Sequence, residues 1–260
     1  MPALPLTPIR RSAFPEKFPT LYFAIQPLQS LKPNRNKSGR SMFIGHFAVA
    51  FGAKRYAPRV SMALLTAAVA WADLLWTAFL PSGWEHVRIS PGDTAFTPFD
   101  LYDYPWSHSL LMLVLWGVLL GAVYWWVQKD TTGAPVVGAC VVSHWVLDWV
   151  THRPDMPLYP GGRKFGLGLW NSIAGTMAVE LTMYIAGVWI YATATRAKNP
   201  VGRYAFWAYV ALLLFFYISD RFSNPPNSVR EIAWTGLIAT MVLLAWAWWF
   251  DRNREVAGTV

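Results

Sequence analysis

Residues 107–127 read SHSLLMLVLWGVLLGAVYWWV, and this stretch decides the fold class. After His108 it contains no charged side chain. A spanning α-helix needs about 20 consecutive, mostly apolar residues to cross the hydrocarbon core of a bilayer. The stretch therefore predicts a transmembrane helix.

Similar apolar runs lie on both sides of this helix. They cover about residues 60–80, 134–151, 172–194, 204–219 and 232–250. An apolar run at 43–53 is too short to span alone, so we expect a half-helix buried among the others. The sequence predicts an all-α, polytopic membrane protein with about six transmembrane helices and one short N-terminal half-helix.

The composition excludes an ordinary soluble domain. Of the 260 residues, 55% are hydrophobic and only 14% are charged, and 16 are Trp. Such a chain is too apolar and too poor in charge to be stable in water as a single domain. The one cysteine, Cys140, excludes an internal disulfide and a thiolate metal cage. Any metal must be bound by histidine and carboxylate ligands.

Most of the formal charge of +8 lies in residues 1–41, which carry seven Lys and Arg against Glu16. This segment is rich in Pro and Ser and has no sustained periodicity, so we expect a disordered tail attracted to anionic lipid rather than to nucleic acid. Met42 is an alternative start. We divide the chain into this tail, a membrane core with the candidate metal site (42–195) and a C-terminal pair of transmembrane helices (196–260).

The short loops predict the orientation. Placing residue 54 in the cytoplasm brings nine Lys and Arg to that side, and cytoplasmic loops of membrane proteins carry such an excess. The long loops 81–106 and 152–171 then lie outside. We expect a multi-pass protein of the bacterial inner (plasma) membrane whose site is toward the non-cytoplasmic face.

Charged side chains in a bilayer core are costly and usually functional. Asp73, His144 and Glu180 lie at similar distances from the outer ends of three predicted helices, roughly 10 to 12 Å below the outer surface. His144, Asp148 and His152 follow each other at intervals of four, which places them on one stripe of a helix. His108 and His152 lie closer to the outer surface.

These residues predict a metal site. His46, His108, His144 and His152 are four of the five histidines, and only His86 lies in a plain loop. Mixed imidazole and carboxylate ligands suit Zn²⁺ first, with Mn²⁺ or Fe²⁺ as alternatives. Taken singly, each residue has a simpler interpretation: a buried histidine bonds a carbonyl, or Asp148 pairs with Arg153. Their common depth on several helices favours metal.

The segments Gly45-His46, Trp71-Ala72-Asp73, Ser107-His108-Ser109 and His144 to Asp148 resemble the YdjM-type family of predicted membrane-bound metal-dependent hydrolases. The resemblance covers about residues 42–195. That family is distantly similar to the zinc-dependent phospholipase C and P1-nuclease group, which cleaves phosphoesters. The resemblance implies these metal ligands, the last two more weakly: His46, Asp73, His108, His144, Asp148, His152 and Glu180.

One element departs from the family pattern. Where the family often has His-Arg before a Thr-His-Ser element, this chain reads Tyr102-Asp103-Tyr104-Pro105-Trp106-Ser107-His108. One ligand is therefore absent or replaced by Asp103.

The resulting hypothesis is a hydrolase of a phosphoester, such as a lipid head group or a lipid-linked phosphate. Asp73 or Glu180 is expected to act as the base. Arg153, Arg163 and Lys164 are candidates to bind the phosphate. Two alternatives stay open, a membrane transporter or ion pathway and a non-catalytic, metal-stabilised scaffold. The sequence specifies no oligomeric state.

Overall fold

The computed structural model describes residues 44–257. The expectations for the basic tail (1–41) and for Met42 lie outside these residues. Within them, five helices are long and apolar enough to cross a membrane. They are α5 (Leu110–Gln128), α6 (Gly133–Thr151), α7 (Ile173–Ala194), α8 (Pro200–Asp220) and α9 (Val229–Arg252). The predicted polytopic helical fold is confirmed, including the half-helix, which is α1 (Ile44–Ala53).

The remaining predicted span, residues 60–80, is not one continuous helix. It consists of α2 (Met62–Val69) and α3 (Trp71–Ser82), whose axes differ by 59°. The chain has no Pro or Gly at Ala70, so the sequence carries no sign of this break. The bend turns the Val69 carbonyl toward α6, where it accepts a hydrogen bond of 2.7 Å from His144 Nδ1. A tertiary hydrogen bond thus accompanies the local break.

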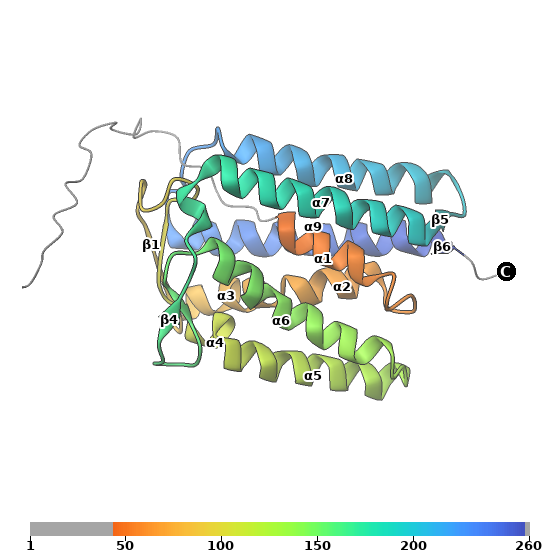
Figure 1. The fold of residues 1–260 in the computed structure, drawn as a ribbon, viewed down its shortest axis with the longest axis horizontal. Helices are drawn as coiled ribbons and strands as arrows, with labels where there is room; N and C mark the ends of the chain where they lie inside the picture. The colour runs from red at the N-terminus through yellow and green to blue at the C-terminus, as the bar shows by residue number, and fades with distance from the viewer. Residues whose placement is uncertain (1–43, 258–260) are drawn as a thin grey trace, which may run out of the picture. The chain divides into compact units, whose positions relative to one another are not determined.

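All the long helices run between the same two ends of the described structure (Figure 1). We call the end formed by residues 83–104, 152–172 and 221–228 the loop face. It carries two antiparallel pairs of short strands, β1 (His86–Ile89) with β2 (Phe99–Asp103) and β3 (Met156–Pro157) with β4 (Lys164–Phe165). It also carries the short helices α4 (Pro105–His108) and η1 (Leu169–Asn171). At the opposite end, β5 (Thr195–Ala197) pairs with β6 (Arg254–Val256).

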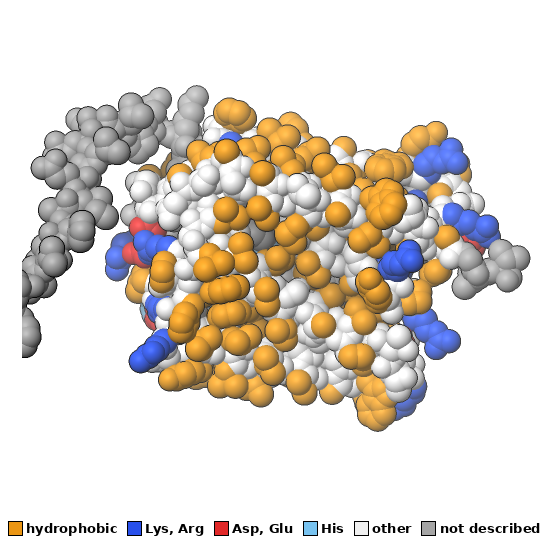
Figure 2. All heavy atoms as spheres, in the orientation of Figure 1, with side chains coloured by type: hydrophobic (Ala, Val, Ile, Leu, Met, Phe, Trp, Pro, Cys, Tyr) orange, Lys and Arg blue, Asp and Glu red, His pale blue; other side chains and the backbone are white. Residues whose placement is uncertain are grey.

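The surface between the two ends is apolar, as a bilayer requires. Figure 2 shows hydrophobic side chains along the helices and Lys and Arg side chains at both ends. On α5, Val118, Trp126 and Val127 are among the most exposed large side chains. The backbones of α5 and α6 approach closely at Gly117, where a Cβ atom would lie 2.8 Å from the Gly138 carbonyl oxygen. Small residues commonly permit such contacts between membrane helices.

A buried ion pair joins four helical segments at the end opposite the loop face. Lys54 Nζ donates to the Val60 carbonyl and to Asp251 Oδ2, both at 2.8 Å. Asp251 also accepts hydrogen bonds from the Met62 backbone N–H and the Tyr191 hydroxyl. Both charged side chains are only 8% exposed. The pair therefore connects the residues after α1 with the start of α2, with α7 and with α9.

We expect Asp251→Ala to destabilise the fold by about 3 to 5 kcal/mol, because it leaves the Lys54 ammonium buried without its counter-ion. Unfolding in detergent, followed by tryptophan fluorescence, measures this loss. Glu255→Ala is the control, because Glu255 lies at the same end but forms an exposed pair with Arg196. Equal losses for the two variants would contradict the special role given to the buried pair.

Candidate metal centre

The structure brings six of the predicted residues together near the loop face. His46 comes from α1, Asp73 from the first turn of α3, and His108 from the end of α4. His144 and Asp148 lie on α6, and His152 immediately follows that helix. Segments far apart in the sequence therefore supply one cluster. Two overlapping trios have ligand atoms within 4.8 Å of one another: His46, His144 and Asp148, and Asp73, His108 and His144.

Asp148 is the centre of this cluster. Its Oδ2 atom lies 3.1 Å from His144 Nε2, 3.7 Å from His152 Nε2 and 3.9 Å from His108 Nε2. Its other oxygen, Oδ1, lies 3.4 Å from His46 Nε2. All four imidazoles thus direct the same nitrogen, Nε2, toward one carboxylate.

Asp73 provides a second carboxylate that faces the Nε2 atoms of two of these rings. Its Oδ1 atom lies 3.6 Å from His108 Nε2 and 3.9 Å from His144 Nε2. The ring of His144 lies between those of His46 and His108, at centroid distances of 4.0 and 5.1 Å. The imidazoles are therefore packed against one another and not merely in the same region.

The Nδ1 atoms of three of the rings are occupied by the protein. His144 Nδ1 bonds the Val69 carbonyl, His108 Nδ1 lies 2.6 Å from Ser107 Oγ, and His152 Nδ1 lies 2.9 Å from Asp155 Oδ1. A carbonyl or an ionised carboxylate can only accept, so the Nδ1 of His144 and of His152 must carry a proton. In the neutral form of each ring the lone pair is therefore on Nε2, the nitrogen that faces Asp148.

Access to the cluster is one-sided. The side chains of the four histidines and of Asp148 are between 2% and 6% exposed, whereas that of Asp73 is 49% exposed. The open side of the cluster therefore lies at the Asp73 carboxylate.

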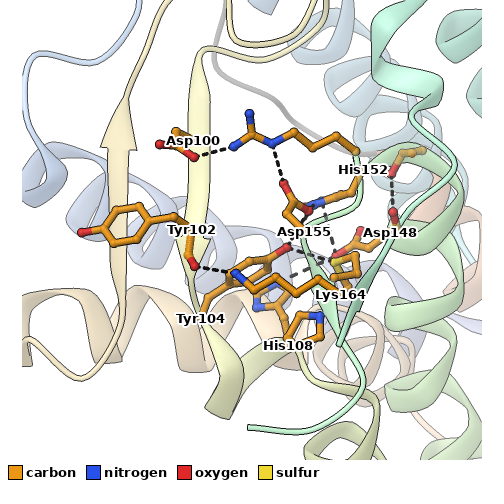
Figure 3. A network of polar contacts seen from close by, with 12 residues as sticks. Asp100, Tyr102, Tyr104, His108, Asp148, His152, Asp155 and Lys164 are labelled. Carbon is orange, nitrogen blue, oxygen red and sulfur yellow. Dashed lines mark hydrogen bonds and ion pairs between the residues drawn. The ribbon is translucent and has the colours of Figure 1, made fainter. Parts of the chain in front are cut away.

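The loop face covers another side of the cluster with a charged network (Figure 3). Arg153 donates to Asp93, Asp100 and Asp155. Burial alone would lower the pKa of Arg153, but these carboxylates raise it above its ordinary value. Asp155 also accepts a 2.9 Å hydrogen bond from the Tyr104 hydroxyl. Burial and this carboxylate raise the pKa of Tyr104, which keeps the phenol protonated as a donor.

A comparison with known protein families shows the family to which the chain belongs. The model of a family described as YdjM inner membrane protein matches residues 42–224. The chain belongs to this family. No curated protein and no solved structure matches the chain significantly. The family and the apolar helices together support a multi-pass protein of the inner membrane.

The YdjM match extends further than the resemblance read from the short motifs. It runs through the end of α8 instead of ending near residue 195, and it includes all six clustered residues. Helix α9 lies beyond the matched range but packs against α2, α3 and α8.

Other predicted residues are placed elsewhere. Asp103 does not replace a ligand: it pairs with His86 at 2.9 Å, and both side chains are about half exposed. Arg153 does not pair with Asp148, and its three carboxylate partners leave it poorly suited to bind phosphate. Lys164 donates to the Tyr102 carbonyl. Arg163 is exposed in the turn between β3 and β4.

Glu180 is buried but belongs to neither trio. It is 1% exposed on α7, close to the first residues of α1 and to Tyr217. The charge of Asp148 acts on Glu180, so Glu180 lies near the cluster, on the α1 and α8 side.

Glu85 is a buried acidic residue that the sequence does not mark as functional. This carboxylate is 1% exposed and accepts hydrogen bonds from the backbone N–H groups of Trp106 and Ser107 and from the Ser107 hydroxyl. An acidic residue in a loop, two residues after a helix-ending glycine, carries no sequence signal that distinguishes it from a solvated one.

Proposed function

We propose that this YdjM family member is a membrane-bound, metal-dependent hydrolase of phosphoesters, with Asp148 as the central ligand. The ligand set comprises His46, Asp73, His108, His144, Asp148 and His152. The convergence of four imidazole Nε2 atoms on one buried carboxylate supports this proposal most directly.

The distances favour a shared ion over hydrogen bonds. Nitrogen-to-oxygen hydrogen bonds span about 2.7 to 3.2 Å. Of the six distances from a histidine Nε2 to Asp148 or Asp73, only that between His144 and Asp148 lies in this range. Two ligand atoms at about 2.1 Å from one tetrahedral ion lie about 3.4 Å apart. The remaining distances, 3.4 to 3.9 Å, are close to that separation.

The groups behind the rings support the same proposal. Histidine ligands usually donate Nδ1–H to a carbonyl or a carboxylate, which fixes the ring and leaves Nε2 for the metal. His144 and His152 have such partners in Val69 and Asp155. A histidine with only a structural role needs hydrogen-bond partners for its nitrogens. It does not need its Nε2 atom to face the same carboxylate as three other histidines.

The donor set favours Zn²⁺, with Mn²⁺ or Fe²⁺ as alternatives. When bound, such an ion supplies Lewis-acid polarisation of a phosphoryl oxygen and acidifies a water molecule. Asp148 offers one oxygen to His46 and the other to the remaining rings. A carboxylate in this position suits either a single ion or a pair of ions that share it.

Asp73 is the residue of this chain best placed to accept a proton from the attacking water. It touches two of the rings and is the only member of the cluster with a substantially exposed side chain. Glu180 is 1% exposed and belongs to neither trio, so it is less well placed to accept a proton from water at the cluster. Among the two predicted bases, the geometry therefore favours Asp73.

A membrane-resident phosphoester is the proposed substrate, either a lipid head group or a lipid-linked phosphate. His144 lies seven residues before the loop-face end of α6, which corresponds to about 10 Å. A head group at the bilayer surface needs only a small displacement to reach this depth.

A site confined to one end of the helices fits the structure better than a transport pathway. The opposite end contains the buried pair of Lys54 and Asp251, but Ala50, Phe51 and Leu65 are fully buried between that pair and the cluster. A chain of polar groups crossing the bilayer, which ion pathways use, is interrupted by this apolar layer.

The proposed orientation places the loop face outside the cytoplasm. Among the described residues, the opposite end carries nine Lys and Arg against three acids, whereas the loop face carries five against five. The excess of basic residues favours the cytoplasm for the opposite end.

We expect a cysteine introduced by Tyr159→Cys on the loop face to react with a membrane-impermeant maleimide in intact cells. Lys198→Cys, at the opposite end, is expected to react only after permeabilisation. The native Cys140 is 2% exposed and gives little background. The reverse labelling pattern would place the site on the cytoplasmic side.

Elemental analysis of the protein purified in detergent is expected to find a stoichiometric divalent metal. His144→Ala and Asp148→Ala should each reduce the bound metal severely, because both residues lie at the centre of the cluster. His86→Ala is the matched control, since His86 is half exposed and pairs with Asp103. Unchanged metal content in both cluster variants, with monodisperse elution showing intact folding, would refute the metal site.

The hydrolase is tested with the metal-loaded protein in vesicles that contain a panel of phospholipids and lipid-linked phosphates. We expect release of phosphate or head group that a chelator abolishes. Asp73→Asn should lower kcat by about 10²- to 10⁴-fold, the usual contribution of a general base. A protein that is loaded with metal but inert toward the whole panel would instead support the structural scaffold.

A further inference from the structure

Glu85 occupies a position that neither the family resemblance nor the proposed ligand set explains. It is nearly fully buried, yet it follows α3 in a loop. Gly83 ends α3 in the left-handed conformation, with φ 74°, and the Trp84 N–H bonds back to the Phe79 carbonyl. This turn directs the chain toward α4, which carries Ser107 and His108.

The hydrogen bonds of Glu85 fix where protons lie. Its Oε1 accepts from the N–H groups of Trp106, at 2.7 Å, and Ser107, at 2.8 Å. Two such donors stabilise the ionised carboxylate, which can only accept. Its Oε2 lies 2.5 Å from Ser107 Oγ, so the serine hydroxyl proton must point to Glu85. This distance suits a charge-assisted hydrogen bond.

The same bond determines the state of His108. Ser107 Oγ lies 2.6 Å from His108 Nδ1 and, having given its proton to the bond with Glu85, presents only lone pairs to the ring. His108 Nδ1 must therefore carry the ring proton. The lone pair is left on Nε2, which faces Asp73 and Asp148. Ser107 is fully buried and His108 is 5% exposed, so water does not compete for these bonds.

From this relay we infer that Glu85 is a positioning residue for His108, acting through Ser107 to hold the imidazole in the tautomer whose Nε2 binds metal. His108 is then held at both nitrogens by one continuous segment: Asp73, on α3, faces Nε2, and Glu85, after α3, controls Nδ1. The effect of Glu85 on metal affinity rests on the proposed metal site. Its effect on the tautomer does not.

Glu85→Gln is the sharpest test because it keeps the size of the side chain and an oxygen for the two backbone donors. Its amide NH₂ group would donate to Ser107 Oγ, so the serine hydroxyl would donate to His108 Nδ1 instead. The ring would change to the tautomer with a proton on Nε2. Long-range ¹H–¹⁵N spectra of metal-free, ¹⁵N-histidine-labelled protein, at a pH above the ordinary imidazole pKa, report the tautomer directly. His108→Gln assigns the signal.

We expect the wild-type His108 to carry its proton on Nδ1 and Glu85→Gln to reverse this state. Metal affinity, measured by competition with a chelator, should fall about 10- to 100-fold in Glu85→Gln and in Ser107→Ala, as is usual when the group behind a histidine ligand is lost. Ser107→Thr retains the hydroxyl and should restore both properties. Asp103→Asn is the control, because it removes an exposed carboxylate next to α4 that bonds only His86 among the described residues.

A wild-type His108 with its proton on Nε2 would overturn the inference. So would a Glu85→Gln variant that keeps both the wild-type tautomer and the wild-type affinity. If the wild-type protein binds no metal, the proposed function fails, but the tautomer spectra still decide the role of Glu85. A variant that loses folding is recognised by its elution profile, and Ser107→Ala with its threonine counterpart then provides the test.

Discussion

The structure near the loop face depends on how the negative charge of the buried Asp148 carboxylate is compensated. It is 4% exposed on a helix that crosses the bilayer, where an uncompensated charge costs several kcal/mol. Four imidazoles from three helical segments surround it, and most of them lie too far away to satisfy it by hydrogen bonds alone. His144, at 3.1 Å, is close enough to pair with it directly, and in the function proposed above a divalent cation between the rings would compensate the charge further.

Two local features of the backbone make that convergence possible. The break between α2 and α3 presents the Val69 carbonyl to His144, and the same break begins α3 just before Asp73. At its other end, α3 stops at Gly83 and places Glu85 against α4. Two of the three carboxylates that bear on His108 therefore come from one segment of 13 residues, Asp73 to Glu85, and the two ends of α3 set their positions.

The sequence predicted the membrane helices well because their signal is local. Apolar runs of sufficient length follow from bilayer thickness, and α5, α6 and α7 begin and end within three residues of the expected positions. The predicted common depth of Asp73, His144 and Glu180 agrees with the contact of the first two in one trio, whereas Glu180 belongs to neither trio. The four-residue spacing of His144, Asp148 and His152 added the common stripe.

The sequence could not predict the features that depend on tertiary contacts. The span breaks at Ala70 without Pro or Gly. The hydrogen bond that accompanies this break comes from His144 on α6. Arg153 looked available for phosphate, but its carboxylate partners Asp93 and Asp100 lie more than 50 residues away along the chain. No sequence pattern distinguishes Glu85, because its proposed role depends on a hydrogen bond from the Ser107 hydroxyl on α4. In each case the deciding partner is distant in sequence, and only the folded arrangement of the helices reveals it.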